Sequence, residues 1–208
     1  MQAIKNIKTV FFSPTGNTKR VVEQLAEKLV QKLNVPIEKD DFTLPAAHTE
    51  TRIYLPEDLV IFGVPTYAGR IPNKVLPFVQ ELFKGTQTPA VAVVTFGNRS
   101  FDNSLSELDA ELKKNNFSIL GAGAVVCKHA FAEVGTGRPN TADNEQLSAF
   151  ADSVFEKLQT ASQPLPDLAI KRNEALTAYY VPLGTDEKPV NLLKAKPITD
   201  KAKCDNCG

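Results

Sequence analysis

One polar loop, Ser13-Pro14-Thr15-Gly16-Asn17-Thr18, joins a predicted buried strand to a predicted helix. Strand-forming residues 7–12 precede the loop, and apolar residues recur after it at the spacing of one helix face. Unpaired N–H groups and the dipole at a helix N-terminus favour an anion. The hydroxyl and amide donors of the loop suit a phosphate monoester, and Gly16 lets the backbone come close. The sequence therefore predicts a phosphate site built from neutral donors.

Two observations limit this interpretation of the loop. It has neither the lysine of a Walker-type loop nor the pattern G-x-G-x-x-G, so it does not look built for phosphoryl transfer. The same residue types are also common in turns and at helix N-caps. Taken alone, the loop leaves phosphate binding and ordinary turn chemistry both open.

The rest of the chain alternates strand and helix patterns, which favours a parallel sheet covered on both faces. Helices are expected from Pro72 to Phe83, over 105–112 and over 147–158, and residues 44–57 predict an irregular connection with at most a short helix. The predicted strands after the first are residues 36–42 at a polar edge, then 58–64, 89–95 and 117–127. The prediction is an α/β fold with a doubly wound five-stranded parallel sheet in the order 2-1-3-4-5. Such a sheet binds its ligand beyond the carboxyl ends of strands one and three.

The loops after the third and fourth predicted strands, residues 65–72 and 95–101, both place aromatic residues among small and polar ones. Tyr67, and Phe96 or Phe101, could flank a planar ring, while glycines leave room for its edge. Each loop taken singly is also explained by turn glycines, a surface tyrosine or a core phenylalanine. Three such loops at the three predicted positions favour flavin mononucleotide (FMN), which joins one terminal phosphate to a planar ring system.

Over about residues 1–160 the chain resembles a flavodoxin-like FMN domain, on the residues just given. Residues 65–72 and 96–101 are further similar to a bacterial and archaeal family in which a flavodoxin domain precedes a ferredoxin domain with 4Fe–4S clusters. The resemblance implies electron transfer between FMN and iron–sulfur centres, without a catalytic residue. The cofactor-binding residues that it implies are Ser13, Thr15, Gly16, Asn17, Thr18, Pro65, Thr66, Tyr67, Ala68, Gly69, Arg70, Thr95, Phe96, Gly97, Asn98, Arg99 and Phe101.

The C-terminal residues 204–208 resemble the start of the ferredoxin motif C-x₂-C-x₂-C-x₃-C-P. Cys204 and Cys207 would be metal ligands only if the missing ferredoxin part is present, and an unliganded end is the alternative. Residues 161–203 contain five prolines and are expected to be a linker, partly draped on the domain through Tyr179, Tyr180 and Val181. The expected partner is a tethered ferredoxin domain or a separate redox protein.

Two further features near the expected site concern charge and mobility. Arg70 is expected to place a cation near the flavin ring and to raise the potential of the fully reduced flavin, and Arg99 either acts similarly or is solvated. Residues 128–139 follow the fifth strand and suggest a flap, in which His129 is either a proton donor or a hydrogen-bonded structural residue. Cys127 is expected to be a small core residue.

Composition narrows the function classes. Lys+Arg and Asp+Glu balance at 24 each, so net charge suggests neither nucleic acid nor an anionic membrane as partner. The chain has no apolar run of membrane-spanning length and no signal-peptide pattern, and a cytoplasmic location is the expectation. The alternative functions are an FMN-dependent NAD(P)H:quinone or flavin reductase, and a non-redox module that retains the fold.

Overall fold

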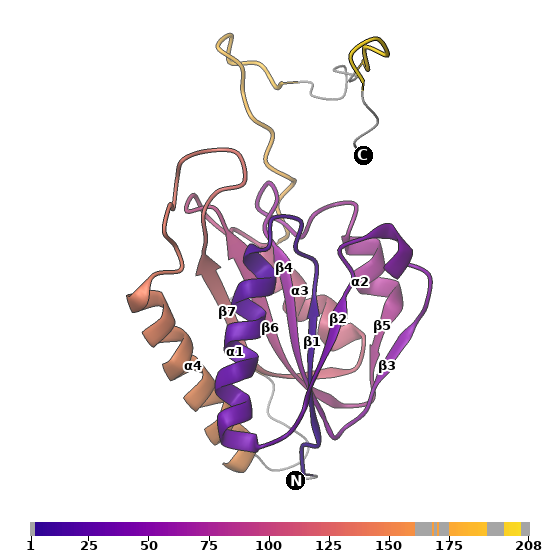
Figure 1. Cartoon of the computed structure of the whole chain (residues 1–208), viewed down its shortest axis with the longest axis vertical. Coiled ribbons are helices and arrows are strands. Elements are labelled where there is room, and N and C mark those ends of the chain that lie inside the picture. Colours follow the sequence, from indigo (N-terminus) through magenta and orange to yellow (C-terminus); the bar gives the residue numbers. More distant parts are fainter. Residues whose placement is uncertain (1–2, 161–167, 169, 171–174, 191–197, 205–208) are drawn as a thin grey trace.

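Five strands pair in parallel to form the central sheet of the computed structural model (Figure 1). The structure describes residues 3–160, 168, 170, 175–190 and 198–204. The sheet strands are β1 (Asn6–Phe11), β2 (Ile37–Asp41), β4 (Asp58–Pro65), β6 (Thr88–Phe96) and β7 (Phe117–Val126). Their order is β2-β1-β4-β6-β7, which confirms the predicted order 2-1-3-4-5, and the polar strand β2 lies at one edge.

Helices cover both faces of the sheet, as expected when every strand crossover is parallel. On one face lie α1 (Asn17–Leu33) and α4 (Thr141–Thr160), which pack on one cluster of buried residues. On the other face lie α2 (Leu76–Leu82) and α3 (Ser104–Lys114), which pack on a second cluster. Figure 1 shows α1 and α4 in front of the sheet, with α3 behind it.

The central strand β4 links the two cores. Because side chains alternate along a strand, Val60, Phe62 and Val64 enter the cluster beside α2 and α3, while Leu59 and Ile61 enter the cluster beside α1 and α4. Gly63 faces α1, and a Cβ atom there would clash with Cγ2 of Val22. The absence of a side chain at Gly63 therefore lets α1 pack directly on the sheet.

The structure corrects the sequence prediction around residues 44–85. A second, two-stranded parallel sheet joins β3 (Arg52–Tyr54) to β5 (Phe83–Gly85). Residues 44–57, which were predicted to be an irregular connection with at most a short helix, contain the short 3₁₀ helix at Pro45–Ala47 and also β3. The helix expected from Pro72 begins at Leu76 and ends at Leu82. Pro77 explains the late start, since proline lacks an N–H and fits only the first turn of a helix. Phe83 lies in β5 and packs its ring 4.8 Å from that of Phe42.

Part of the predicted linker is described. Residues 175–190 continue beyond α4 and contain an isolated bridge between Leu183 and Pro189. Figure 1 shows this segment leaving the body of the molecule at the end where the sheet strands terminate. Cys207 and most of residues 161–174 lie outside the described residues, and the proposed domain boundaries stay a prediction. Among the described helices, none has the length and apolar character needed to cross a membrane.

We predict that Gly63→Ala lowers the free energy of unfolding by about 1–3 kcal/mol, because the added methyl forces α1 away from β4. The matched control is Gly123→Ala in β7, where the nearest atom, of Phe150, lies at an ordinary contact distance of 3.4 Å. That change is expected to stay within about 0.5 kcal/mol of the parent. Urea unfolding of the three proteins measures both, and equal losses would contradict the packing argument.

Candidate functional site

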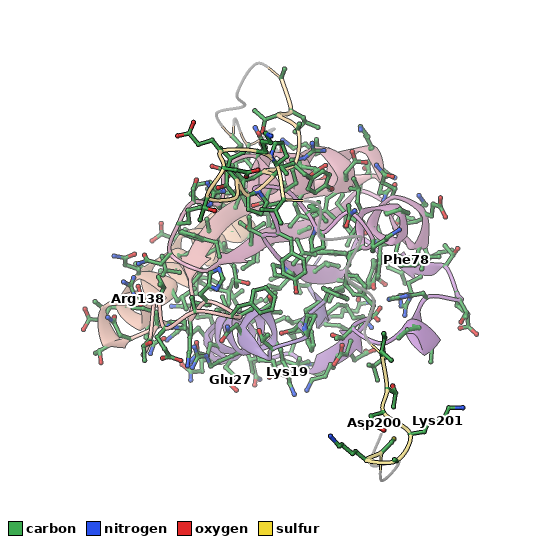
Figure 2. The ribbon with its side chains drawn as sticks, turned by 90° about the horizontal axis from the view of Figure 1, so that it is seen from above. Lys19, Glu27, Phe78, Arg138, Asp200 and Lys201 are labelled. Carbon is green, nitrogen blue, oxygen red and sulfur yellow. The ribbon has the colours of Figure 1, made fainter. Side chains whose placement is uncertain are left out.

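A pocket lies where the carboxyl ends of β1, β4, β6 and β7 meet, which is the position predicted from the strand order. It contains about 560 Å³ of open space, including space continuous with solvent. Figure 2 views the molecule onto this end, with Lys19 of α1 and Arg138 labelled. The lining residues are Pro14, Thr15, Asn17, Thr18, Pro65, Thr66, Tyr67, Thr95, Phe96, Gly97, Cys127, Lys128, His129, Ala130 and Phe131.

The loop between β1 and α1 forms one end of the pocket. Gly16 precedes the helix with φ +78°, a left-handed conformation that glycine adopts without strain. The hydroxyl of Ser13 accepts a hydrogen bond of 2.9 Å from the N–H of Lys19 in the first turn of α1, and Ser13 does not line the pocket. Helical geometry leaves the N–H groups of Asn17 and Thr18 without an intrahelical partner. The loop therefore offers backbone donors and the Thr15 hydroxyl to an anion.

Two hydrogen bonds tie this loop to other strands of the sheet. The hydroxyls of Thr18 and Thr95 are buried and lie 2.8 Å apart, which connects α1 to β6 beneath the pocket. The Asn17 side chain donates a bond of 3.0 Å to the carbonyl of Lys128, after β7. The loop is thus held in place by Thr95 of β6 and by the carbonyl of Lys128, just after β7.

A tight turn at residues 67–70 forms the opposite wall. The N–H of Tyr67 donates to the carbonyl of Arg70 at 2.9 Å, and the N–H of Arg70 donates back at 3.1 Å. Ala68 and Gly69 have φ of +50° and +82°, as in a type I′ turn. Tyr67 lines the pocket and is 42% exposed, and its partial burial raises the pKa of its phenol, which therefore stays neutral. Ala68 and Gly69 shape the turn without lining the pocket.

Arg70 is not directed at the pocket. Its guanidinium forms a two-pronged ion pair with Glu107 of α3, and the Glu107 side chain is only 1% exposed. This hydrogen bonding raises the pKa of Arg70. Glu107 also accepts a 3.0 Å bond from the N–H of Ile71. The buried pair carries no net charge, so the structure gives no basis for the expected effect of a lone cation at Arg70 on the flavin.

In the loop after β6, residues 96–101, only some of the predicted site residues face the pocket. Phe96 and Gly97 line the pocket, whereas Asn98, Arg99 and Phe101 do not. The ring of Phe101 packs 5.4 Å from that of Phe96, and Arg99 pairs with Asp102 on the surface. Of the residues predicted from the sequence, the structure therefore brings together those nearest the strand ends.

The sequence-based set of site residues omitted the wall after β7, although the segment was expected near the site. Lys128, His129, Ala130 and Phe131 line the pocket, and Phe131 is 94% exposed. The signal that could have identified them is the position of their loop after a sheet strand, at the same edge as the others.

His129 and Cys127 both have structural surroundings. Nδ1 of His129 accepts hydrogen bonds from the N–H groups of Phe131 (3.1 Å) and Ala132 (3.2 Å), which folds the loop around the ring. Gly97 packs against the same ring, where a Cβ atom would come within 2.5 Å. Burial raises the pKa of the Cys127 thiol to about 11, so the thiol is protonated at neutral pH. The two hydrogen bonds to Nδ1 agree with the interpretation of His129 as a hydrogen-bonded structural residue.

Comparison with known proteins decides the family. The sequence model named Flavodoxin matches residues 10–159. The chain belongs to the flavodoxin family. No curated protein sequence matches the flavodoxin chain significantly.

Solved flavodoxins share this fold. An archaeal flavodoxin is 15% identical, with a TM-score of 0.51, and the match covers 74% of this chain and 99% of that one. Flavodoxin 2 from Bacillus cereus is 15% identical, with a TM-score of 0.54 and the same coverages of 74% and 99%. An NADH:FMN oxidoreductase, EmoB, is 14% identical, with a TM-score of 0.52 and coverages of 77% and 92%. At these identities the likeness shows the fold.

No cluster of three or more metal-ligating side chains occurs among the described residues of this flavodoxin. Cys204 is exposed, and Cys207 is not among the described residues. The assignment of these two cysteines to an iron–sulfur cluster therefore stays a prediction.

We predict that Arg70→Ala lowers the free energy of unfolding by about 3–5 kcal/mol, because it leaves the Glu107 carboxylate buried without its partner. Arg99→Ala is the control, since its pair with Asp102 is solvent-exposed and is worth at most about 1 kcal/mol. Denaturant unfolding at neutral pH measures both losses. If the two variants lose similar amounts of unfolding free energy, the buried Arg70–Glu107 pair contributes no more to stability than an exposed pair does.

Proposed function

We propose that this flavodoxin binds FMN in the pocket and works as an electron-transfer domain. The observation that carries the proposal is the arrangement of the pocket, which has a helix N-terminus with neutral donors on one side and Tyr67 and Phe96 on the other. An anion fits the first side and a planar ring the second. FMN has both parts in one molecule.

The donor chemistry of the pocket fits the group. The hydroxyl of Thr15, the second N–H of the Asn17 side-chain amide and the first-turn N–H groups of α1 would hold the phosphate. Lys128 is the cationic residue in the lining, and its ammonium pairs with Glu133 at 3.0 Å. The phosphate would therefore be held mainly by neutral donors and the helix dipole. Tyr67 and Phe96 would flank the ring, and a neutral phenol at Tyr67 avoids repulsion of a reduced, negatively charged flavin.

When bound, FMN supplies the redox chemistry, and the residues of this chain supply position and environment. Two pocket residues, His129 and Cys127, are of types used in acid–base or nucleophilic chemistry, but their surroundings do not favour such a role. Nδ1 of His129 accepts two backbone bonds, and the Cys127 thiol is protonated. Both facts favour an electron carrier over a hydrolytic or group-transfer enzyme.

We further propose that the electron partner is an iron–sulfur protein, either a separate ferredoxin or a ferredoxin domain that follows Cys204-x-x-Cys207 in a longer chain. Support comes from the cysteine spacing and from the exposed aromatic residues Phe131 and Tyr67 at the pocket. A reduced 4Fe–4S ferredoxin should bleach the flavin absorbance of the FMN-loaded chain under anaerobic conditions. Unchanged absorbance, with dithionite still bleaching it, would exclude this partner class.

The second candidate function is an FMN-dependent NAD(P)H:quinone or flavin reductase. It is kept because an NADH:FMN oxidoreductase has the same fold and because the pocket opens to solvent beside Phe131. Steady oxidation of NADH or NADPH by the FMN-loaded chain, with a quinone or free flavin as acceptor, would favour this function. A loaded chain that leaves both nucleotides unoxidised would favour the electron carrier.

We predict that the chain stripped of flavin binds FMN more tightly than riboflavin, because only FMN reaches the loop at residues 13–18 with a phosphate. Thr15→Val should lower the affinity for FMN about 10- to 100-fold, the value of one hydrogen bond to a charged group, and leave riboflavin binding unchanged. Quenching of flavin fluorescence measures each affinity.

The control for this experiment is Thr49→Val, which makes the same chemical change outside the pocket. It should alter neither affinity. If FMN and riboflavin bind the parent equally, or if Thr15→Val weakens both to the same extent, the phosphate does not lie at this loop. A parent chain that binds no flavin contradicts the proposed function as a whole.

A further inference from the structure

Four residues of the C-terminal segment, 177–180, lie against the turn that carries Tyr67, and we call them the strap. The N–H of Tyr180 donates a 2.9 Å hydrogen bond to the carbonyl of Ala68. The carbonyl of Thr177 accepts a 2.7 Å bond from Arg70. The phenol of Tyr179 donates a 2.8 Å bond to the carbonyl of Ile71. The strap therefore meets the backbone or side chain of three residues in or next to the turn.

Asn103 holds the strap and the turn at the same time. It is 1% exposed, and its N–H donates to the carbonyl of Gly69 at 2.9 Å. Its side-chain oxygen accepts from the N–H of Thr177 at 3.2 Å and from the Thr177 hydroxyl at 2.6 Å. A movement of the strap therefore acts on a residue that also fixes the turn.

Two cations add to the contact between the strap and the body. The guanidinium of Arg70 lies 4.9 Å from the ring centre of Tyr179, and that of Arg99 lies 5.0 Å from the ring centre of Tyr180. Both arginines are already paired with carboxylates, Glu107 and Asp102 respectively. The aromatic rings of the strap thus cover ion pairs whose positions are set by the body of the domain.

The contact matters because the turn is not strongly fixed by its own sequence. Ala68 has a φ of +50°, which is unfavourable for a residue with a Cβ atom. The carbonyl of Ala68 bonds outward to the strap, so any conformation that directs this carbonyl elsewhere must break the bond to Tyr180. Tyr67, the first residue of the turn, lines the pocket.

We propose that the strap is a positioning element that holds the 67–70 turn in the conformation that receives the flavin ring. Residues 177–180 act through the turn and do not themselves line the pocket. Displacement of the strap loosens the turn and lowers the affinity for FMN. This inference rests on the proposed function for its effect on FMN, but the hold of the strap on the turn does not depend on it.

The test compares Tyr180→Pro with Tyr180→Ala in the full chain. Proline removes the N–H that bonds to Ala68, whereas alanine keeps this N–H and removes only the ring beside Arg99. The first measurement, on protein without flavin, is hydrogen exchange of the Arg70 amide, which closes the turn by its bond to Tyr67. We expect Tyr180→Pro to speed this exchange about two- to tenfold, the range of one neutral hydrogen bond, and Tyr180→Ala to speed it less.

The second measurement is the affinity for FMN, which should fall about two- to tenfold in Tyr180→Pro. Thr177→Val tests the other end of the strap, because it removes the 2.6 Å bond to Asn103 at an exposed position, and it should shift both measurements in the same direction. Because binding is reciprocal, FMN should also protect residues 175–190 from proteolysis in the parent chain.

The outcomes separate the two proposals. Parent-like exchange at Arg70 in Tyr180→Pro overturns the strap, whether or not the chain binds FMN. Equal effects of proline and alanine would show that the ring of Tyr180, and not its N–H, makes the contact, which contradicts the inference as stated. Faster exchange with unchanged FMN affinity overturns the link from turn to flavin. A parent chain that binds no FMN but shows the expected exchange leaves the strap in place and removes the proposed function.

Discussion

The close packing of α1 on β4 is the constraint on which the rest of the structure depends. It is made possible by Gly63, whose missing side chain leaves room for Val22 and Thr18 of the helix. The contact fixes the start of α1 directly above the carboxyl ends of the central strands. Unpaired N–H groups and the positive end of the helix dipole then face the pocket. The absence of a side chain at Gly63 therefore helps to set where the N-terminus of α1 lies relative to the pocket.

The pocket is assembled by hydrogen bonds between segments that are far apart in the chain. Thr18 meets Thr95 in the floor, and Asn17 reaches the carbonyl of Lys128. Glu107 binds both Arg70 and the N–H of Ile71 next to the turn. Each bond uses a side chain that also belongs to a helix end or a loop at the site. Stability and site geometry therefore depend on the same residues, and changes to one will alter the other.

The charged side chains near the pocket are paired with groups of opposite charge. Arg70, Arg99 and Lys128 are each paired with a carboxylate, so cations near the pocket are compensated by neighbouring charges. Tyr67 and Cys127 have raised pKa values, mainly because of burial, and both are neutral at physiological pH. If FMN binds as proposed, local dipoles more than fixed charges would set its redox behaviour.

The sequence patterns were most informative about the long, strongly patterned elements. The apolar run of β4 and the periodicity of α1 predicted a parallel α/β sheet, and the loop at residues 13–18 was predicted to bind an anion at a helix start. They were least informative about the short elements. β3 and β5 have three residues each, and they form because Tyr54 and Phe83 find buried partners that local propensity does not reveal.

At the candidate site, too, some features follow from local sequence patterns and others from distant contacts. Local sequence patterns were enough to predict that the loops after the central strands meet at one edge of the sheet, because helix and strand periodicity is visible in short stretches of sequence. The side chains that face the pocket are selected by contacts between distant parts of the chain. Arg70 turns to Glu107, and Phe131 joins the lining from beyond β7. Residues 177–180 return to the turn from more than a hundred positions further along the chain. These choices depend on partners distant in sequence, and no local pattern records the partner of a buried charge or of an exposed strap.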